Sequence, residues 1–180
     1  MPVWAWILIA VAVAAVIAVA VVVASSFWHR AVGRYLRRVV GKREEARTLR
    51  RAFEELVVGL REGPDVERAR FADDPEAIEH HSLADLSDQA RVLAEELNAM
   101  PLPRRLVPAA EALADASDIV AEEADRAGEG TIPDERLEAL ASTDLERVNR
   151  AFAFADARIS PLCEEYDVDE ADVYGRGLYI

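Results

Sequence analysis

The chain has 180 residues and carries 21 Lys and Arg against 34 Asp and Glu, which gives a formal net charge of −13. Nucleic-acid phosphates repel a protein of this charge, so we expect no nucleic-acid partner. A single cysteine excludes an internal disulfide and suits a reducing compartment.

The chain begins with an uncharged run from residue 3 to residue 24. As a helix this run would span about 33 Å, against about 30 Å for the hydrocarbon core of a bilayer. Trp4 and Trp6 at one end, with Phe27 and Trp28 at the other, suit the two aromatic belts of a membrane. The run is longer than the apolar core of a cleaved signal peptide, and no basic residue precedes it. We therefore predict a retained transmembrane anchor over residues 1–28, in a single-pass protein.

Six basic residues follow the predicted span, and we call them the basic collar. Because they lie on its C-terminal side, the positive-inside rule predicts an external N-terminus and a cytoplasmic domain over residues 29–180. Arginine far outnumbers lysine, a composition typical of GC-rich bacterial genomes, so the expected location is a bacterial inner membrane. The collar is expected to contact lipid headgroups, which makes the bilayer the first predicted partner. It consists of Arg30, Arg34, Arg37, Arg38, Lys42 and Arg43.

Charge divides the rest of the chain into two parts. Residues 29–51 carry a net charge of +7, whereas residues 52–180 carry −20. Anionic lipids of the cytoplasmic leaflet attract the first part and repel the second. We therefore expect the acidic part to stand away from the membrane surface while the collar holds to it.

Apolar residues recur at spacings of three and four, the period of a helix, and no segment shows the sustained alternation of a strand. Residues 29–63 are predicted to form a stalk helix that stops before Gly63-Pro64. This stalk either completes the bundle of its own chain, which we favour, or pairs with a second chain as a parallel coiled coil. Its predicted seam consists of Val32, Tyr35, Val39, Lys42, Ala46, Leu49, Phe53, Leu56 and Leu60.

Residues 64–166 are predicted to form an acidic helical bundle. Residues 64–81 are irregular, and the second helix is expected to open at Ser82. A capping box of Thr143 and Glu146 is expected to start the last long helix, which Pro161 ends or kinks. The predicted fold class is all-α: a single N-terminal transmembrane helix followed by a small cytoplasmic bundle of three or four long helices.

The one arrangement that suits metal chemistry lies at the start of this bundle. On a helix, Glu76 and His80 are one turn apart, as are His81 and Asp85, and a carboxylate with an imidazole can bind a transition metal. Solvated residues at a helix start explain the same pattern, so we expect no metal and no cofactor. No motif for catalysis is present.

The chain ends in a predicted tail, residues 167–180. Its last three residues, Leu178, Tyr179 and Ile180, have the form that peptide-binding domains capture at a sheet edge. We favour a tail that covers an apolar seam of its own bundle; a tail that binds a partner in this way and a disordered tail are the alternatives.

These features together predict a non-enzymatic scaffold or adaptor, tethered to the membrane and presenting an acidic helical bundle to a protein partner. Two alternatives remain. One is a metal-binding sensor or enzyme that uses the histidine and carboxylate cluster. The other is a membrane-anchored homo-oligomer with a structural role.

Overall fold

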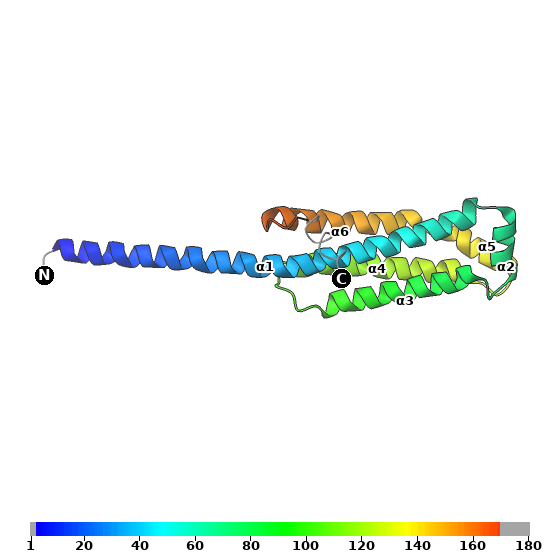
Figure 1. Ribbon diagram of the computed structural model, residues 1–180, viewed down its shortest axis with the longest axis horizontal. Coiled ribbons are helices and arrows are strands. Elements are labelled where there is room, and N and C mark those ends of the chain that lie inside the picture. The colour runs from blue at the N-terminus through cyan, green and yellow to red at the C-terminus, as the bar shows by residue number, and fades with distance from the viewer. Residues whose placement is uncertain (1–2, 170–180) are drawn as a thin grey trace, which may run out of the picture.

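The computed structural model describes residues 3–169, apart from the side chains of residues 3–15, 18, 22, 25 and 26 (Figure 1). Within this range the chain forms six helices and no strand, so the all-α prediction is confirmed. The helices are α1 (Val3–Glu62), α2 (Asp65–Asp73), α3 (Ile78–Ala99), α4 (Val107–Gly128), α5 (Pro133–Ser142) and α6 (Leu145–Glu165).

Four long helices, α1, α3, α4 and α6, lie side by side and alternate in direction along the chain (Figure 1). Short connections favour this antiparallel arrangement. The first part of α1 projects beyond the bundle, and α2 and α5 close the opposite, distal end. The prediction of a bundle of three or four long helices is therefore confirmed, with four.

Judged on the side chains that are described, none of these helices is long and apolar enough to cross a membrane. Most of the predicted span, residues 3–15, 18 and 22, lies outside those side chains.

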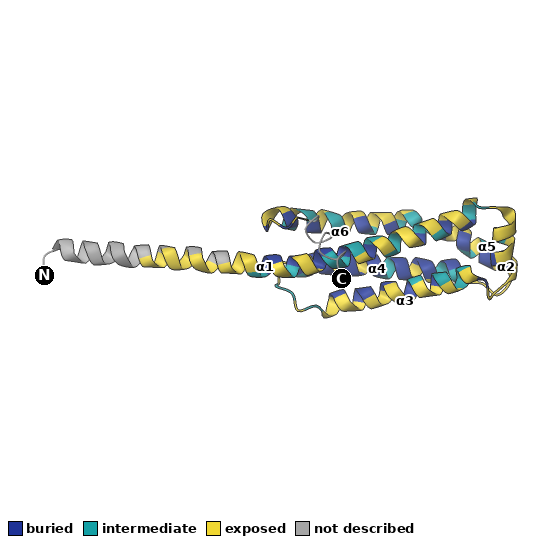
Figure 2. Cartoon of the chain, viewed as in Figure 1, coloured by how far each residue is buried: buried dark blue, intermediate teal, exposed yellow. Residues whose placement is uncertain are grey.

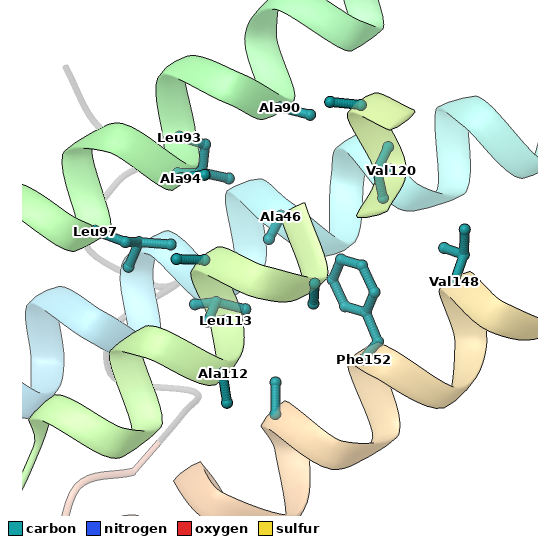
Figure 3. Packing of buried hydrophobic residues seen from close by; sticks show 14 of the residues in the cluster. Ala46, Ala90, Leu93, Ala94, Leu97, Ala112, Leu113, Val120, Val148 and Phe152 are labelled. Atoms are coloured by element: carbon teal, nitrogen blue, oxygen red, sulfur yellow. The ribbon is translucent and has the colours of Figure 1, made fainter. Parts of the chain in front are cut away.

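The central element of the bundle is α4, which contacts α1, α3, α5 and α6. Twelve of its residues are buried, and eight of these are alanines. Small side chains let the neighbouring helices approach the α4 backbone closely, so the core is built around this helix (Figures 2 and 3). The larger side chains Leu113 and Val120 fill the space toward α3 and α6, from which Leu93, Leu97 and Phe152 project.

The stalk packs within its own chain: α1 contacts α3, α4 and α6, and its face over residues 32–60 is buried. Every seventh residue of the predicted seam, from Val32 to Leu60, is buried as expected. At the intermediate positions of the seam, the prediction was wrong by one residue. Leu36, Arg43 and Val57 are buried, whereas the predicted seam residue just before each of them is only half-buried. A helix that packs against three other long helices buries a wider face than the narrow seam of a two-stranded coiled coil.

Two predicted helix starts were also wrong. α3 begins at Ile78, and Ser82 lies inside it with its hydroxyl donating to the carbonyl oxygen of Ile78 at 2.9 Å. The residue that caps α6 is Asp144, whose carboxylate accepts the main-chain N–H of Arg147 at 2.8 Å. An aspartate one residue after the threonine offers an equally good cap, and the chain uses it.

Pro161 neither ends nor restarts the last helix, because α6 continues through it to Glu165. The short helix α2 was not predicted at all. It buries Phe71 and Ala72, and its remaining side chains are half-buried or exposed, so it has no amphipathic signal to read.

Arginines hold the distal end together by binding the carboxyl ends of other helices. Arg61 donates to the main-chain oxygen of Leu140 in α5 at 2.6 Å, and Arg136 of α5 donates to that of Ala72 in α2 at 2.6 Å. Arg68 donates in turn to the oxygen of Arg61 at 3.1 Å. The last carbonyls of a helix lack partners within it, so each guanidinium satisfies and charge-stabilises a helix end.

Replacing Gly130 by alanine is expected to lower the free energy of unfolding by about 1–3 kcal/mol. Gly130 has φ +118°, and an added Cβ would lie 2.7 Å from the main-chain nitrogen of Arg136. Urea titration of the full chain in nonionic detergent measures the loss. Gly59→Ala is the control: a Cβ at this helical glycine meets nothing within 4 Å, so about 0.5–1 kcal/mol of added stability is expected. An unchanged free energy of unfolding in Gly130→Ala would show that this turn does not require glycine.

Candidate functional site

A cavity of about 560 Å³ lies where the projecting part of α1 meets the end of α6. We call it the junction pocket. Its α1 wall carries three collar arginines at helical spacing, and its α6 wall is the turn that follows the helix. The lining residues are Phe27, His29, Arg30, Gly33, Arg34, Arg37, Tyr166 and Asp167.

The turn after α6 gives the pocket its second wall. Asp167 adopts a left-handed conformation with φ 51°, and the N–H of Val168 donates to the oxygen of Cys163 at 3.0 Å. This is the hydrogen bond of a Schellman motif, in which the left-handed residue follows the helix cap. Val168 and Cys163 are both buried, which adds the apolar contact usual in that motif. The turn thereby fixes Tyr166 and Asp167 against α1.

Tyr166 and Gly33 are the buried members of the described pocket wall, and Tyr166 has only 8% of its surface exposed. Its ring lies 4.9 Å from the ring of His29, centroid to centroid. Its hydroxyl has no hydrogen-bond partner among the residues that the structure describes. Such a buried polar atom costs free energy, and a ligand that offers an acceptor would remove that cost.

The collar divides into two groups. Arg30, Arg34, Arg37 and Arg38 are exposed, and none of them forms an ion pair with a residue in the described part of the chain. Lys42 is half-buried and bonds to Glu45 and Glu96 at 2.6 and 2.7 Å. The hydrogen bond to Glu45, followed by that to Glu96, raises the pKa of Lys42 despite its desolvation.

Arg43 belongs to the bundle and not to its outer surface, because its side chain is only 3% exposed. Its Nε donates to Asp156 of α6 at 2.6 Å, and Arg47 donates to the second oxygen of that carboxylate at 3.0 Å. Desolvation raises the pKa of Asp156, but the hydrogen bonds from Arg43 and Arg47 outweigh it and hold the pKa below its ordinary value. The predicted lipid-facing set therefore reduces to the four arginines without ion pairs.

The exposed side of α4 presents a second charged surface, which we call the acidic stripe. Its members recur once per turn on the one face of α4 that other helices leave uncovered. Desolvation, together with repulsion from Asp115 and Glu122, raises the pKa of Asp118. Arginines pair with only two members, Glu122 with Arg147 and Asp125 with Arg91. The stripe consists of Glu111, Asp115, Asp118, Glu122 and Asp125.

The candidate metal ligands named from the sequence are dispersed around the start of α3. The Nε2 of His80 bonds to the main-chain oxygen of Phe71 at 2.8 Å, and its ring stacks on that side chain. His81 lies 3.9 Å from Glu76, and Asp85 is exposed one turn further on. Within the described residues, no group of three or more His, Cys, Asp and Glu side chains could hold a metal ion. This arrangement gives the metal hypothesis no support.

The predicted partner-binding residues Leu178, Tyr179 and Ile180 lie outside the described residues. The chain matches no protein-family model, no curated protein and no solved structure.

Proposed function

We propose that this protein is a membrane-tethered scaffold or adaptor without enzymatic activity, which presents an acidic helical bundle at the cytoplasmic face of a bacterial inner membrane. The observation that carries the proposal is the division of the collar. The four arginines nearest the uncharged run, Arg30 to Arg38, have no acidic partner in the described structure, whereas Lys42 and Arg43 are paired with carboxylates of the bundle. Cations without ion pairs directly after an apolar run suit the headgroups of anionic lipids.

The acidic stripe supports the second half of the proposal. Four of its five members are exposed and Asp118 is half-buried, it runs along the central helix of the bundle, and three of its five carboxylates form no ion pair with the described residues. A basic surface of a protein partner complements it, and such complementarity increases association rate and specificity. In this proposal the bundle is the scaffold, and the acidic stripe is the surface that contacts the protein partner.

Membrane fractionation of the full chain tests the anchor. We expect the protein to remain in the membrane pellet after extraction with alkaline carbonate, and Val13→Arg with Ile17→Arg to release it. Each arginine near the middle of a span costs about 2.5–3.5 kcal/mol. Val58→Arg, an exposed position of α1 beyond the predicted span, is the matched control and should stay in the pellet. Complete release of the unmodified chain by carbonate would refute the anchor.

Affinity capture with the full chain in detergent tests the adaptor role. A charge-reversed chain with Asp115→Lys and Asp118→Lys should lose partners that the unmodified chain retains at moderate salt. Reversal of Glu146 and Asp134, exposed acids outside the stripe, should leave them bound. If no partner is recovered at any salt concentration, or if both reversals act equally, the stripe is not the contact surface.

A further inference from the structure

We propose that the junction pocket binds the phosphate of an anionic phospholipid headgroup as a discrete site. This inference rests on the proposed anchor and adds a stereospecific site to it. A collar that acts through charge alone would treat its four unpaired arginines alike. The pocket instead gathers three of them and leaves the fourth, Arg38, outside.

The charges of the pocket favour an anion. Arg30, Arg34 and Arg37 recur at spacings of four and three, so they share one face of α1 and project toward the same cavity. Asp167 is the only acidic residue among the described lining residues, which together carry a net charge of +2 when histidine is counted as neutral. Guanidinium groups bind phosphate with pairs of parallel hydrogen bonds, and three of them here hold no ion pair in the described structure.

The pocket also has an apolar side, which favours a lipid over free phosphate. Phe27 lies one turn before Arg30 on the same face of α1, lines the pocket, and is 69% exposed. A phosphate held between Arg30 and Arg34 would therefore lie about 7 Å from the level of Phe27 along the helix. Acyl chains leaving that phosphate would pass Phe27 in the direction of the uncharged run. Inorganic phosphate has no group that would use this surface.

Tyr166 supplies the wall opposite α1 and one unused donor. Its hydroxyl is buried and has no partner among the described side and main chains. A phosphate oxygen is a strong acceptor for such a group. Arg105 approaches the same ring at 5.8 Å from its centroid, but it is paired with Glu165 at 2.9 Å and adds no net charge to this wall.

The test compares neighbouring arginines of the collar. The full chain in nonionic detergent is titrated with short-chain phosphatidic acid, phosphatidylglycerol and phosphatidylcholine, and separately with inorganic phosphate. Native mass spectrometry gives the stoichiometry, and tryptophan fluorescence gives the affinity. We expect one saturable site for the two anionic lipids, with binding at least tenfold weaker in Arg37→Gln and at most about fivefold weaker in the matched control Arg38→Gln. The fivefold limit corresponds to about 1 kcal/mol for a basic residue that acts only through the surface field.

Asp167→Asn is expected to strengthen the binding of anionic lipid, whereas Arg37→Gln is expected to weaken it. Asp167→Asn removes the one opposing charge of the pocket, and asparagine also tolerates the left-handed conformation, so the turn should persist and anionic lipid should bind more tightly. Far-ultraviolet circular dichroism of every variant checks that the helices are intact.

Each remaining outcome has a definite meaning. Equal losses of lipid affinity in Arg37→Gln and Arg38→Gln would show that the arginines act through a diffuse electrostatic field and not through the pocket. The proposed membrane tether would still stand. Equal affinity for inorganic phosphate would overturn the lipid assignment. Binding of phosphatidylcholine as tight as that of the anionic lipids would overturn the role of charge. Failure of the tether itself is read independently, from the carbonate extraction.

Discussion

Replacing Glu123 by alanine is expected to lower the free energy of unfolding by about 2–4 kcal/mol. Glu123 is fully buried on α4 and accepts three hydrogen bonds, from the main-chain N–H of Asp144 at 2.9 Å, from Arg147 at 2.9 Å and from Arg126 at 2.5 Å. The carboxylate therefore joins the central helix to the start of α6. Its removal leaves three donors without their acceptor and opens a hole beside the core.

The matched control is Glu122→Ala, one residue earlier. Glu122 is exposed and bonds only to Arg147, at 2.6 Å, so its loss should cost less than about 1 kcal/mol. Urea titration of both variants in detergent, followed by circular dichroism, gives the comparison. A similar small loss in both variants would show that the Glu123 network contributes little to stability.

The pH dependence of the unfolding free energy, measured for the unmodified chain and for Glu123→Ala, separates the contribution of the charge of Glu123 from that of its volume. Desolvation raises the pKa of Glu123, but the hydrogen bonds from Asp144, Arg147 and Arg126 outweigh it and hold the pKa below its ordinary value of 4.5. Because the folded pKa is the lower one, the stabilisation is complete above pH 4.5 and is lost as the pH falls through the folded pKa. The stability difference between the unmodified chain and Glu123→Ala should narrow below that pH. If this difference in unfolding free energy does not change with pH, the effect of Glu123 on stability comes from packing alone.

Replacing Phe152 by alanine is expected to cost about 3–5 kcal/mol, a large part of the total stability of a domain of this size. Phe152 is 1% exposed, and it projects from α6 into the core beside α4 (Figure 3). The guanidinium of Arg50 lies 5.2 Å from the centre of its ring. Because eight of the twelve buried residues of α4 are alanines, that helix offers few side chains large enough to fill the cavity.

Phe154, two residues further along α6, is the matched control. It is 55% exposed and contacts Arg158 across its ring, so Phe154→Ala should cost less than about 1 kcal/mol. The midpoints of urea titration give both values. If the two substitutions have the same effect, the core does not lie where the structure places it.

The helices were predictable because their apolar residues repeat with the period of a helix, and the stalk shows where that reasoning fails. Every seventh residue from Val32 to Leu60 was predicted correctly, since an apolar side chain marks it. The second buried row contains Leu36 and Val57 but also Arg43, whose charge hides the pattern. The carboxylate of Asp156 and the hydroxyl of Ser160, both far away in sequence, accept hydrogen bonds from Arg43 and so compensate for that burial.

The candidate site was predictable in part. The collar arginines were evident from their position after the uncharged run, whereas the pocket required knowledge of where α6 ends. Tyr166 is the last residue in the apolar pattern of that helix. The sequence around it does not indicate that the turn it begins lies against His29 and Gly33. Contacts between residues more than a hundred positions apart are set by the packing of the whole bundle.

The unbroken length of α1 gives the molecule a fixed height. From Trp28 to Glu62 the helix runs without interruption for about 50 Å, and its last turn is held by Arg68 at the distal end. In the proposed tether, α2 and α5 are thus carried roughly that far above the bilayer. Lengthening or shortening α1 by one turn would raise or lower them by about 5 Å, and because a whole turn restores the phase of the helix, the acidic stripe would keep nearly the same direction about the membrane normal. The protein would then act as a spacer whose reach is set by one helix.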